Sequence, residues 1–218
     1  ALAFNSYINN KSILVEGIKN VDQIDINNAN HLGYKIKLVG VAECKQKKIT
    51  QSVYPALIKK NSYIAKIDGV LNAVIVESDP VGKTVLQGEG AGAGPTTSSL
   101  VSDLCSILRG NVKFPFVLSD SKRKFAPFEN TNNKKYSAYL RLDVKDKHGI
   151  LSDITKIMAK NKVSVKRLIQ NPTVNKKNAS IIIITHEAKS SSFLKLLSLL
   201  KKKSYIVNFP KMIRIEKI

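Results

Sequence analysis

The sequence predicts an α+β protein in which a mixed or antiparallel sheet with helices on one face is followed by a small unit of order βαββαβ. Three observations support this class. In the first half, strand-like segments follow one another without intervening helices, which suits antiparallel pairing. A polar stretch without periodicity then interrupts the chain. Beyond it, helical and strand periodicities alternate over about 80 residues, enough for a complete small domain.

The first half is predicted to begin with a helix and to continue as strands. Residues 22–33 carry a helix signature, because Asp22 can cap the start, Asp25 sits three residues later and Gly33 can end the helix. Alternating or apolar segments predict strands at 34–44, 49–58, 72–78 and 83–87. Apolar residues at helical spacing then predict a second helix over residues 96–108.

A linker separates the two predicted domains. Residues 111–136 are polar and lack a regular period, so we place the domains at 1–110 and 137–218. The chain has no initiator methionine, and its first residues read like the end of a helix. We therefore expect it to be the C-terminal piece of a longer polypeptide.

The second domain has the periodicities of a ferredoxin-like arrangement. Strands are predicted at 138–145, 163–170, 179–186 and 212–218, and helices at 148–162 and 190–203. In the first of these strands, apolar and polar residues alternate, which predicts one buried and one exposed face. Residues 180–186 are apolar on both faces, and a second copy of the domain could cover the outer face. We therefore expect a homo-oligomer.

A glycine-rich turn at residues 88–93 follows a predicted strand and precedes a helix. It fits the loose GxGxx[GA] pattern of dinucleotide-binding folds. The preceding strand is too polar for a central parallel strand, however, and no βαβ unit surrounds the turn. Free N–H groups at the start of the helix could still face a phosphate or the nicotinamide ribose of a cofactor. A tight strand-to-helix crossing explains the spacing equally well.

Several adjoining segments resemble the C-terminal part of homoserine dehydrogenase. They are "GYKIKLVGVAE", "ITQSVYPALI", "IDGVLNAVIVESDPVG" and "GEGAGAGPTTSSLVSDL", and the likeness covers residues 1–110. The resemblance implies an oxidoreductase that uses NADP or NAD to interconvert L-homoserine and L-aspartate 4-semialdehyde, a step toward threonine, methionine and isoleucine. It also implies that this region forms the substrate and dimerisation domain.

The resemblance implies a cofactor contact at Gly92, with Gly90 and Ala91 beside it. The family's nucleotide-binding domain, its catalytic lysine and the carboxylates that hold homoserine precede this region, so no catalytic residue is expected in this chain. Lys11 and Lys19 match other family positions. We therefore expect these 218 residues alone to be inactive toward homoserine, and the preference for NADP or NAD to be set elsewhere.

The segment "DKHGILSDITKIM" resembles the first loop and helix of an ACT domain, a small-molecule sensor. Asp146, Gly149, Ile150 and Leu151 carry the match, which implies an effector site. Asp146 could receive an amino group while the N–H groups of the helix face a carboxylate, and the pathway points to L-threonine. Alternatively, Asp146 caps the turn and Gly149 only shapes it. A purely effector-binding module is thus the alternative function.

Other features add no further chemistry. The net charge of +20 comes from scattered lysines, and aromatic residues are only 6% of the chain, so we expect neither nucleic acid nor membrane as a partner. Two distant cysteines fit a reducing, cytoplasmic compartment. His31, His148 and His186 lack ligand spacing, so no metal site is expected.

Overall fold

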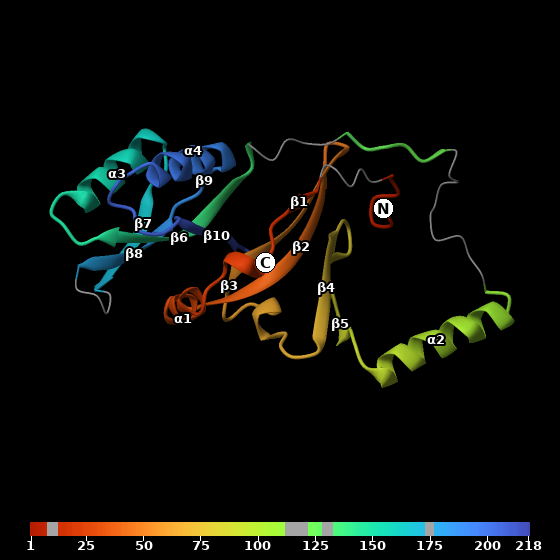
Figure 1. The fold of residues 1–218 in the computed structure, drawn as a ribbon. Helices are drawn as coiled ribbons and strands as arrows, with labels where there is room; N and C mark the ends of the chain where they lie inside the picture. The colour runs from red at the N-terminus through yellow and green to blue at the C-terminus, as the bar shows by residue number, and fades with distance from the viewer. Residues whose placement is uncertain (8–12, 112–121, 128–132, 173–176) are drawn as a thin grey trace. The chain divides into compact units, whose positions relative to one another are not determined.

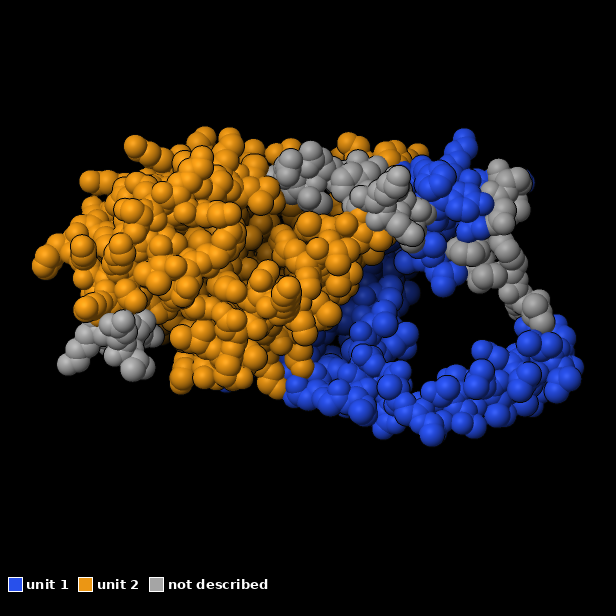
Figure 2. Space-filling model, in the orientation of Figure 1, with its two compact units in different colours: residues 1–8, 60–126, 218 blue, residues 9–59, 127–217 orange. Residues whose placement is uncertain are grey.

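The computed structural model describes residues 1–7, 13–111, 122–127, 133–172 and 177–218, in two compact units (Figures 1 and 2). The smaller unit contains residues 1–8, 60–126 and 218, and the larger contains 9–59 and 127–217. The division differs from the predicted domain boundaries, because strands from both halves of the chain pair within the larger unit. Most of the predicted linker, 112–121 and 128–132, lies outside the described residues.

The larger unit is built on one mixed sheet, which confirms the α+β class. Its helices are α1 Gln23–His31, α3 Ile150–Lys160 and α4 Ser190–Lys201. Its strands are β1 Leu14–Val15, β2 Tyr34–Lys45, β3 Lys48–Lys59, β6 Lys135–Lys145, β7 Val165–Pro172, β8 Asn178–Thr185, β9 Ala188–Lys189 and β10 Lys211–Glu216. A short 3₁₀ helix, Ile18–Asn20, precedes α1.

The sheet joins the two ends of the sequence. Its order is β1-β3-β10-β6-β8-β7, and β2 pairs with β3 through an antiparallel hairpin. In the order β10, β6, β8 and β7, each strand is antiparallel to its neighbour, and together they give the predicted βαββαβ unit. Strand β10 also pairs in parallel with β3, where Arg214 lies opposite Ala56. The second predicted domain therefore extends the sheet of the first.

Both faces of the second half of this sheet are covered. One face packs on α3 and α4, whose buried residues include Ile154, Met158 and Phe193. On the other face, α1 contributes Ala29 to a second cluster with Tyr139. The expectation that β6 has one exposed face is wrong, because α1 buries the side that alternation predicted to be wet.

The isoleucines of β8 are covered within the same chain. Ile181 and Ile183 belong to the core under α3 and α4, while Ile182 and Ile184 join the cluster that contains Ala29. A second copy of the domain is therefore not needed to cover this strand. The apolar sequence of this strand therefore no longer supports self-association, which is now supported only by the family resemblance.

The helix α1 forms as its sequence predicts. Asp22 and Asp25 make a reciprocal capping box, in which the Asp22 N–H donates to the Asp25 carboxylate at 3.1 Å. The helix ends before Gly33, whose φ of +83° suits glycine. These local signals position Asp25 for a contact with the second half of the chain.

The smaller unit contains a hairpin, a short 3₁₀ helix at Ile64–Lys66 and the helix α2, Ala93–Leu108. The hairpin pairs β4, Leu71–Ser78, with β5, Gly82–Glu89. Helix α2 begins three residues earlier than predicted, because Pro95 is tolerated in a first turn that needs no N–H at that position. Apolar residues of α2 are more than half exposed: Leu100, Val101, Leu104, Ile107 and Leu108.

Candidate functional site

The glycine-rich turn lies on the surface of the smaller unit, between β5 and α2. Residues 88–94 are all exposed, so ligands have access to the turn. Gly92 is the N-cap of α2, with φ +126° and ψ 157°, a backbone conformation that favours glycine. The first bond of the helix runs from the Thr96 N–H to the Gly92 carbonyl at 3.2 Å. The preceding N–H groups at the helix start therefore face outward, where an anionic group could bind.

The predicted contact residues Gly90, Ala91 and Gly92 differ in what they can offer. The Gly90 N–H donates to the Val70 carbonyl at 3.2 Å and extends the β4–β5 ladder. A Cβ at position 90 would also overlap the Asn72 side chain, at 1.6 Å from its Nδ2 atom. Gly90 thus fits the hairpin end, which leaves Ala91 and Gly92 as the exposed residues between the hairpin and α2.

The predicted effector loop lies in the larger unit, between β6 and α3. Asp146 is exposed, and its N–H donates to the Lys177 carbonyl at 2.9 Å. Gly149 is the N-cap of α3, with φ +82° in the left-handed region. Ile150 is 9% exposed and anchors the helix in the core, while Leu151 is 36% exposed. The loop therefore exposes the Asp146 carboxylate and the N-terminus of α3, which has 11 residues.

The first turn of α3 is bonded to residues that follow α4. The Asp153 carboxylate accepts a hydrogen bond from the Tyr205 hydroxyl at 2.9 Å and lies 2.8 Å from the Lys203 ammonium. Burial, followed by the bond to Asp153, raises the pKa of the Tyr205 hydroxyl. The start of α3 is thus tied to the segment that follows α4.

We expect the pKa of the Asp153 carboxyl to lie below its ordinary value of about 3.9. The hydrogen bond from Lys203 and that from Tyr205 both lower this pKa. A pKa lowered by folding gives stability that is present above the unfolded value and is lost as the pH falls through the folded value. NMR titration of the carboxyl should show the low midpoint, and Lys203→Ala should raise it. A midpoint that the substitution leaves unchanged would contradict this contact.

The sequence interpretation missed a buried ionic cluster in which Arg141 on β6 meets the start of α1. The Arg141 guanidinium lies 2.7 Å from Asp25, 2.5 Å from Asp22 and 2.8 Å from Asp143. Tyr139 donates a further hydrogen bond to Asp25 at 2.9 Å. Burial alone would lower the pKa of the guanidinium, but hydrogen bonding to Asp25 and the charge of that carboxylate raise it. In the sequence, this cluster is indicated only by an arginine that stands between two leucines of a predicted strand.

Other chemistry is not supported by the described part of the chain. Within it, no three His, Cys, Asp or Glu side chains are grouped so that they could hold a metal ion. Cys44 and Cys105 are both free thiols. None of the described helices is both long enough and apolar enough to cross a membrane.

Comparison with known proteins identifies both halves of the chain. The family model for homoserine dehydrogenase matches residues 1–105, and that for the ACT domain matches residues 138–204. A homoserine dehydrogenase from Helicobacter pylori is 34% identical over 216 residues, covering 99% of this chain and 51% of that protein. Nearly the whole chain is thus similar to about half of a homoserine dehydrogenase. A homoserine dehydrogenase from Neisseria gonorrhoeae is 37% identical over 198 residues, covering 85% of this chain and 44% of that protein.

Solved homoserine dehydrogenase structures have the same fold. The enzyme from Thiobacillus denitrificans superposes with a TM-score of 0.83 at 30% identity, covering 99% of this chain and 50% of that one. That from S. aureus gives 0.63 at 28% identity, covering 100% and 50%. The chain spans about half the length of the curated homoserine dehydrogenases that it matches. The glycine-rich turn lies in the homoserine dehydrogenase match and the loop at 146–151 in the ACT match.

Proposed function

We propose that the chain is the C-terminal part of an NAD(P)-dependent homoserine dehydrogenase with an amino-acid-sensing ACT domain. The parent enzyme would interconvert L-homoserine and L-aspartate 4-semialdehyde in the biosynthesis of threonine, methionine and isoleucine. The observation that carries this proposal is the family match of residues 1–105 together with the ACT match of residues 138–204 in the same chain. We further propose a homo-oligomer that works in the cytoplasm.

The glycine-rich turn is the proposed contact for the nicotinamide end of NADP or NAD. Its support is the exposed Gly92, which has a positive φ at the start of α2, and the exposed Ala91 beside it. Gly90 supports the turn through its bond to Val70. The catalytic lysine and the nucleotide-binding domain would be supplied by the remaining half of the parent enzyme, so these 218 residues alone should not oxidise homoserine.

The loop of Asp146, Gly149, Ile150 and Leu151 is the proposed effector site, and L-threonine is the proposed effector. An amino acid carries an ammonium group and a carboxylate, which suit the exposed Asp146 and the N–H groups at the start of α3. Gly149 permits the close turn that brings these two features together. The hydrogen-bonded first turn at Asp153 keeps the helix start in place.

Calorimetric titration of the 218-residue chain with L-threonine tests the effector site. We expect saturable binding that Asp146→Asn weakens by about tenfold, because the ammonium group loses its charged partner, worth about 1.4 kcal/mol or more. Asp103→Asn is the matched control, since Asp103 is an exposed aspartate in α2, and it should bind as the unchanged chain does. Equal affinity in the unchanged chain and the Asp146 variant would contradict the assignment.

An activity assay separates the parent enzyme from the alternative, a regulatory module without catalytic duty. The 218 residues should show no NADP-dependent oxidation of L-homoserine by themselves, and the complete coding sequence should show it. Oxidation of L-homoserine by the 218 residues alone would contradict the proposal that the remaining half of the parent enzyme supplies the catalytic lysine. A complete protein that binds L-threonine without oxidising homoserine would instead favour the regulatory module.

A further inference from the structure

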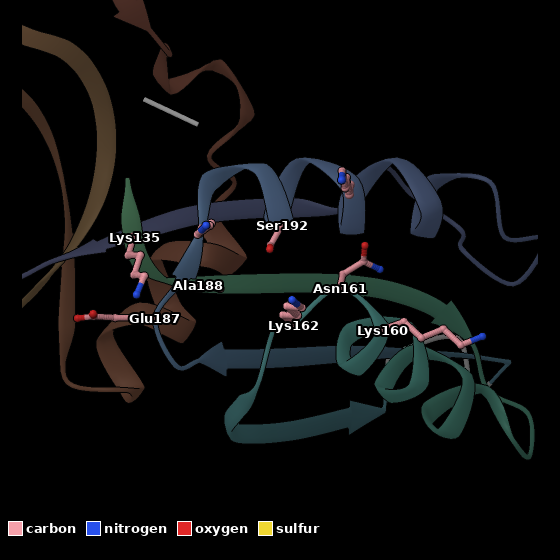
Figure 3. Close-up of a pocket in the computed structure, with 9 residues that line it drawn as sticks. Lys135, Lys160, Asn161, Lys162, Glu187, Ala188 and Ser192 are labelled. Atoms are coloured by element: carbon pink, nitrogen blue, oxygen red, sulfur yellow. The ribbon is translucent and has the colours of Figure 1, made fainter. Parts of the chain in front are cut away.

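A lysine-lined pocket of about 430 Å³ lies in the larger unit, apart from the loop at Asp146 (Figure 3). It is bordered by the ends of α3 and β9, the starts of β6 and α4, and the turn after α3. Its lining residues are Lys135, Lys160, Asn161, Lys162, Glu187, Ala188, Lys189, Ser192 and Lys195. The volume is in the range of pockets that hold small molecules, roughly 300–1,000 Å³.

The charge of the pocket is strongly positive. Five lysines line it against one carboxylate, Glu187. That carboxylate is already engaged at 2.5 Å by Lys217, which lowers its pKa through a hydrogen bond. Within the described residues, Lys160, Lys162 and Lys195 make no ion pair. Among the described residues, the pocket therefore has cations in excess, and its one carboxylate is already paired with a lysine outside the lining.

The lining residues lie on several sides of the hollow, and the Lys160 side chain extends away from the other labelled residues. Lys135 and Lys160 lie at its two ends, and Lys162, Asn161 and Ser192 lie between them (Figure 3). These residues come from three separate stretches of the sequence, at 135, 160–162 and 192, which the fold brings together. Asn161 and Ser192 add polar groups that can hydrogen-bond to a ligand.

We propose that this pocket binds a small ligand that carries two or more phosphate groups. Lysine ammonium groups act as point charges suited to phosphate, whereas a carboxylate ligand is usually held by the planar fork of arginine, and no arginine lines the pocket. Among the described residues, the lining has no aromatic side chain on which a base could stack, which favours recognition of the phosphate groups and not of a base. This inference does not depend on the proposed enzyme activity.

Calorimetric titration of the 218-residue chain with inorganic pyrophosphate and tripolyphosphate tests the proposal. We expect saturable binding, tighter for tripolyphosphate, and a loss of about tenfold or more in the double variant Lys162→Gln, Lys195→Gln. The matched control is Lys48→Gln, Lys166→Gln, which removes the same charge from exposed lysines outside the pocket and should change the affinity less than about twofold.

A second pair of substitutions guards against a folding defect. Lys160→Gln, Lys189→Gln removes two other exposed lining residues and should weaken binding in the same way. Far-UV circular dichroism should be unchanged in all variants. The proposal is overturned by the absence of saturable binding, by equal weakening in pocket and control variants, or by binding of single-stranded RNA but not of pyrophosphate.

Discussion

Replacing Arg141 with methionine should lower the free energy of unfolding of the larger unit by about 3–5 kcal/mol. Arg141 is 6% exposed, and its guanidinium binds the fully buried Asp25 through hydrogen bonds of 2.7 and 3.1 Å. Methionine keeps much of the apolar stem but removes the charge. The Asp25 carboxylate would then remain in the interior without its counter-charge, which is the costly way to break a buried pair. Urea unfolding followed by circular dichroism measures the loss.

Two further variants distinguish a buried charge from general damage. Arg167→Met is the matched control, because Arg167 on β7 is exposed, and it should change the stability by no more than about 0.5 kcal/mol. Adding Asp25→Leu to Arg141→Met should restore part of the lost stability, since the fully buried carboxylate is then removed together with its partner. A loss below about 1 kcal/mol in the Arg141 variant would show that the cluster does not hold α1 on the sheet.

Truncating Phe193 to alanine should cost about 3–5 kcal/mol of stability. Phe193 on α4 is fully buried and stacks on Tyr136 of β6, with ring centroids 5.0 Å apart and an interplanar angle of 13°. The substitution removes the ring from the core between the sheet and α3 and α4 and leaves a cavity. Urea unfolding of the 218-residue chain, followed by circular dichroism, gives the magnitude.

The neighbouring residue provides the control for this truncation. Leu194 lies on the same helix but is 56% exposed, so Leu194→Ala should cost at most about 0.5 kcal/mol. Similar losses in the two variants would mean that α4 is not packed by the face that contains Phe193. That result would contradict the arrangement of the core beneath this helix.

Features with a local cause could be predicted from the sequence. The capping box of Asp22 and Asp25 marks the start of α1, because both partners lie within one turn. The helical spacing of Ile150, Ile154 and Ile157 likewise identifies the buried face of α3. The candidate loops were found the same way, since Gly92 and Gly149 occupy positions where φ is positive.

Features that depend on distant partners could not be predicted. The alternation of apolar and polar residues in β6 predicted that Arg141 is exposed to solvent. Its burial could not be predicted, because the carboxylate that pairs with it lies more than a hundred positions away in the sequence. The helix held by this contact, α1, also covers the outer face of β8, so no second copy of the domain is needed there. The lysine pocket was missed for a similar reason, since Lys135, Lys162 and Lys195 come from separate elements.

The parallel pairing of β10 with β3 has a consequence for the order of assembly on the ribosome. Ala56 to Ile58 are translated before their partners Arg214 to Glu216, from which they are separated by more than 150 residues of sequence. Until then, that edge of β3 has unpaired backbone groups, which are a template for pairing with other strands. Pairing across such a sequence separation is also slow. The nascent chain must therefore keep this edge from mispairing while the intervening residues are made.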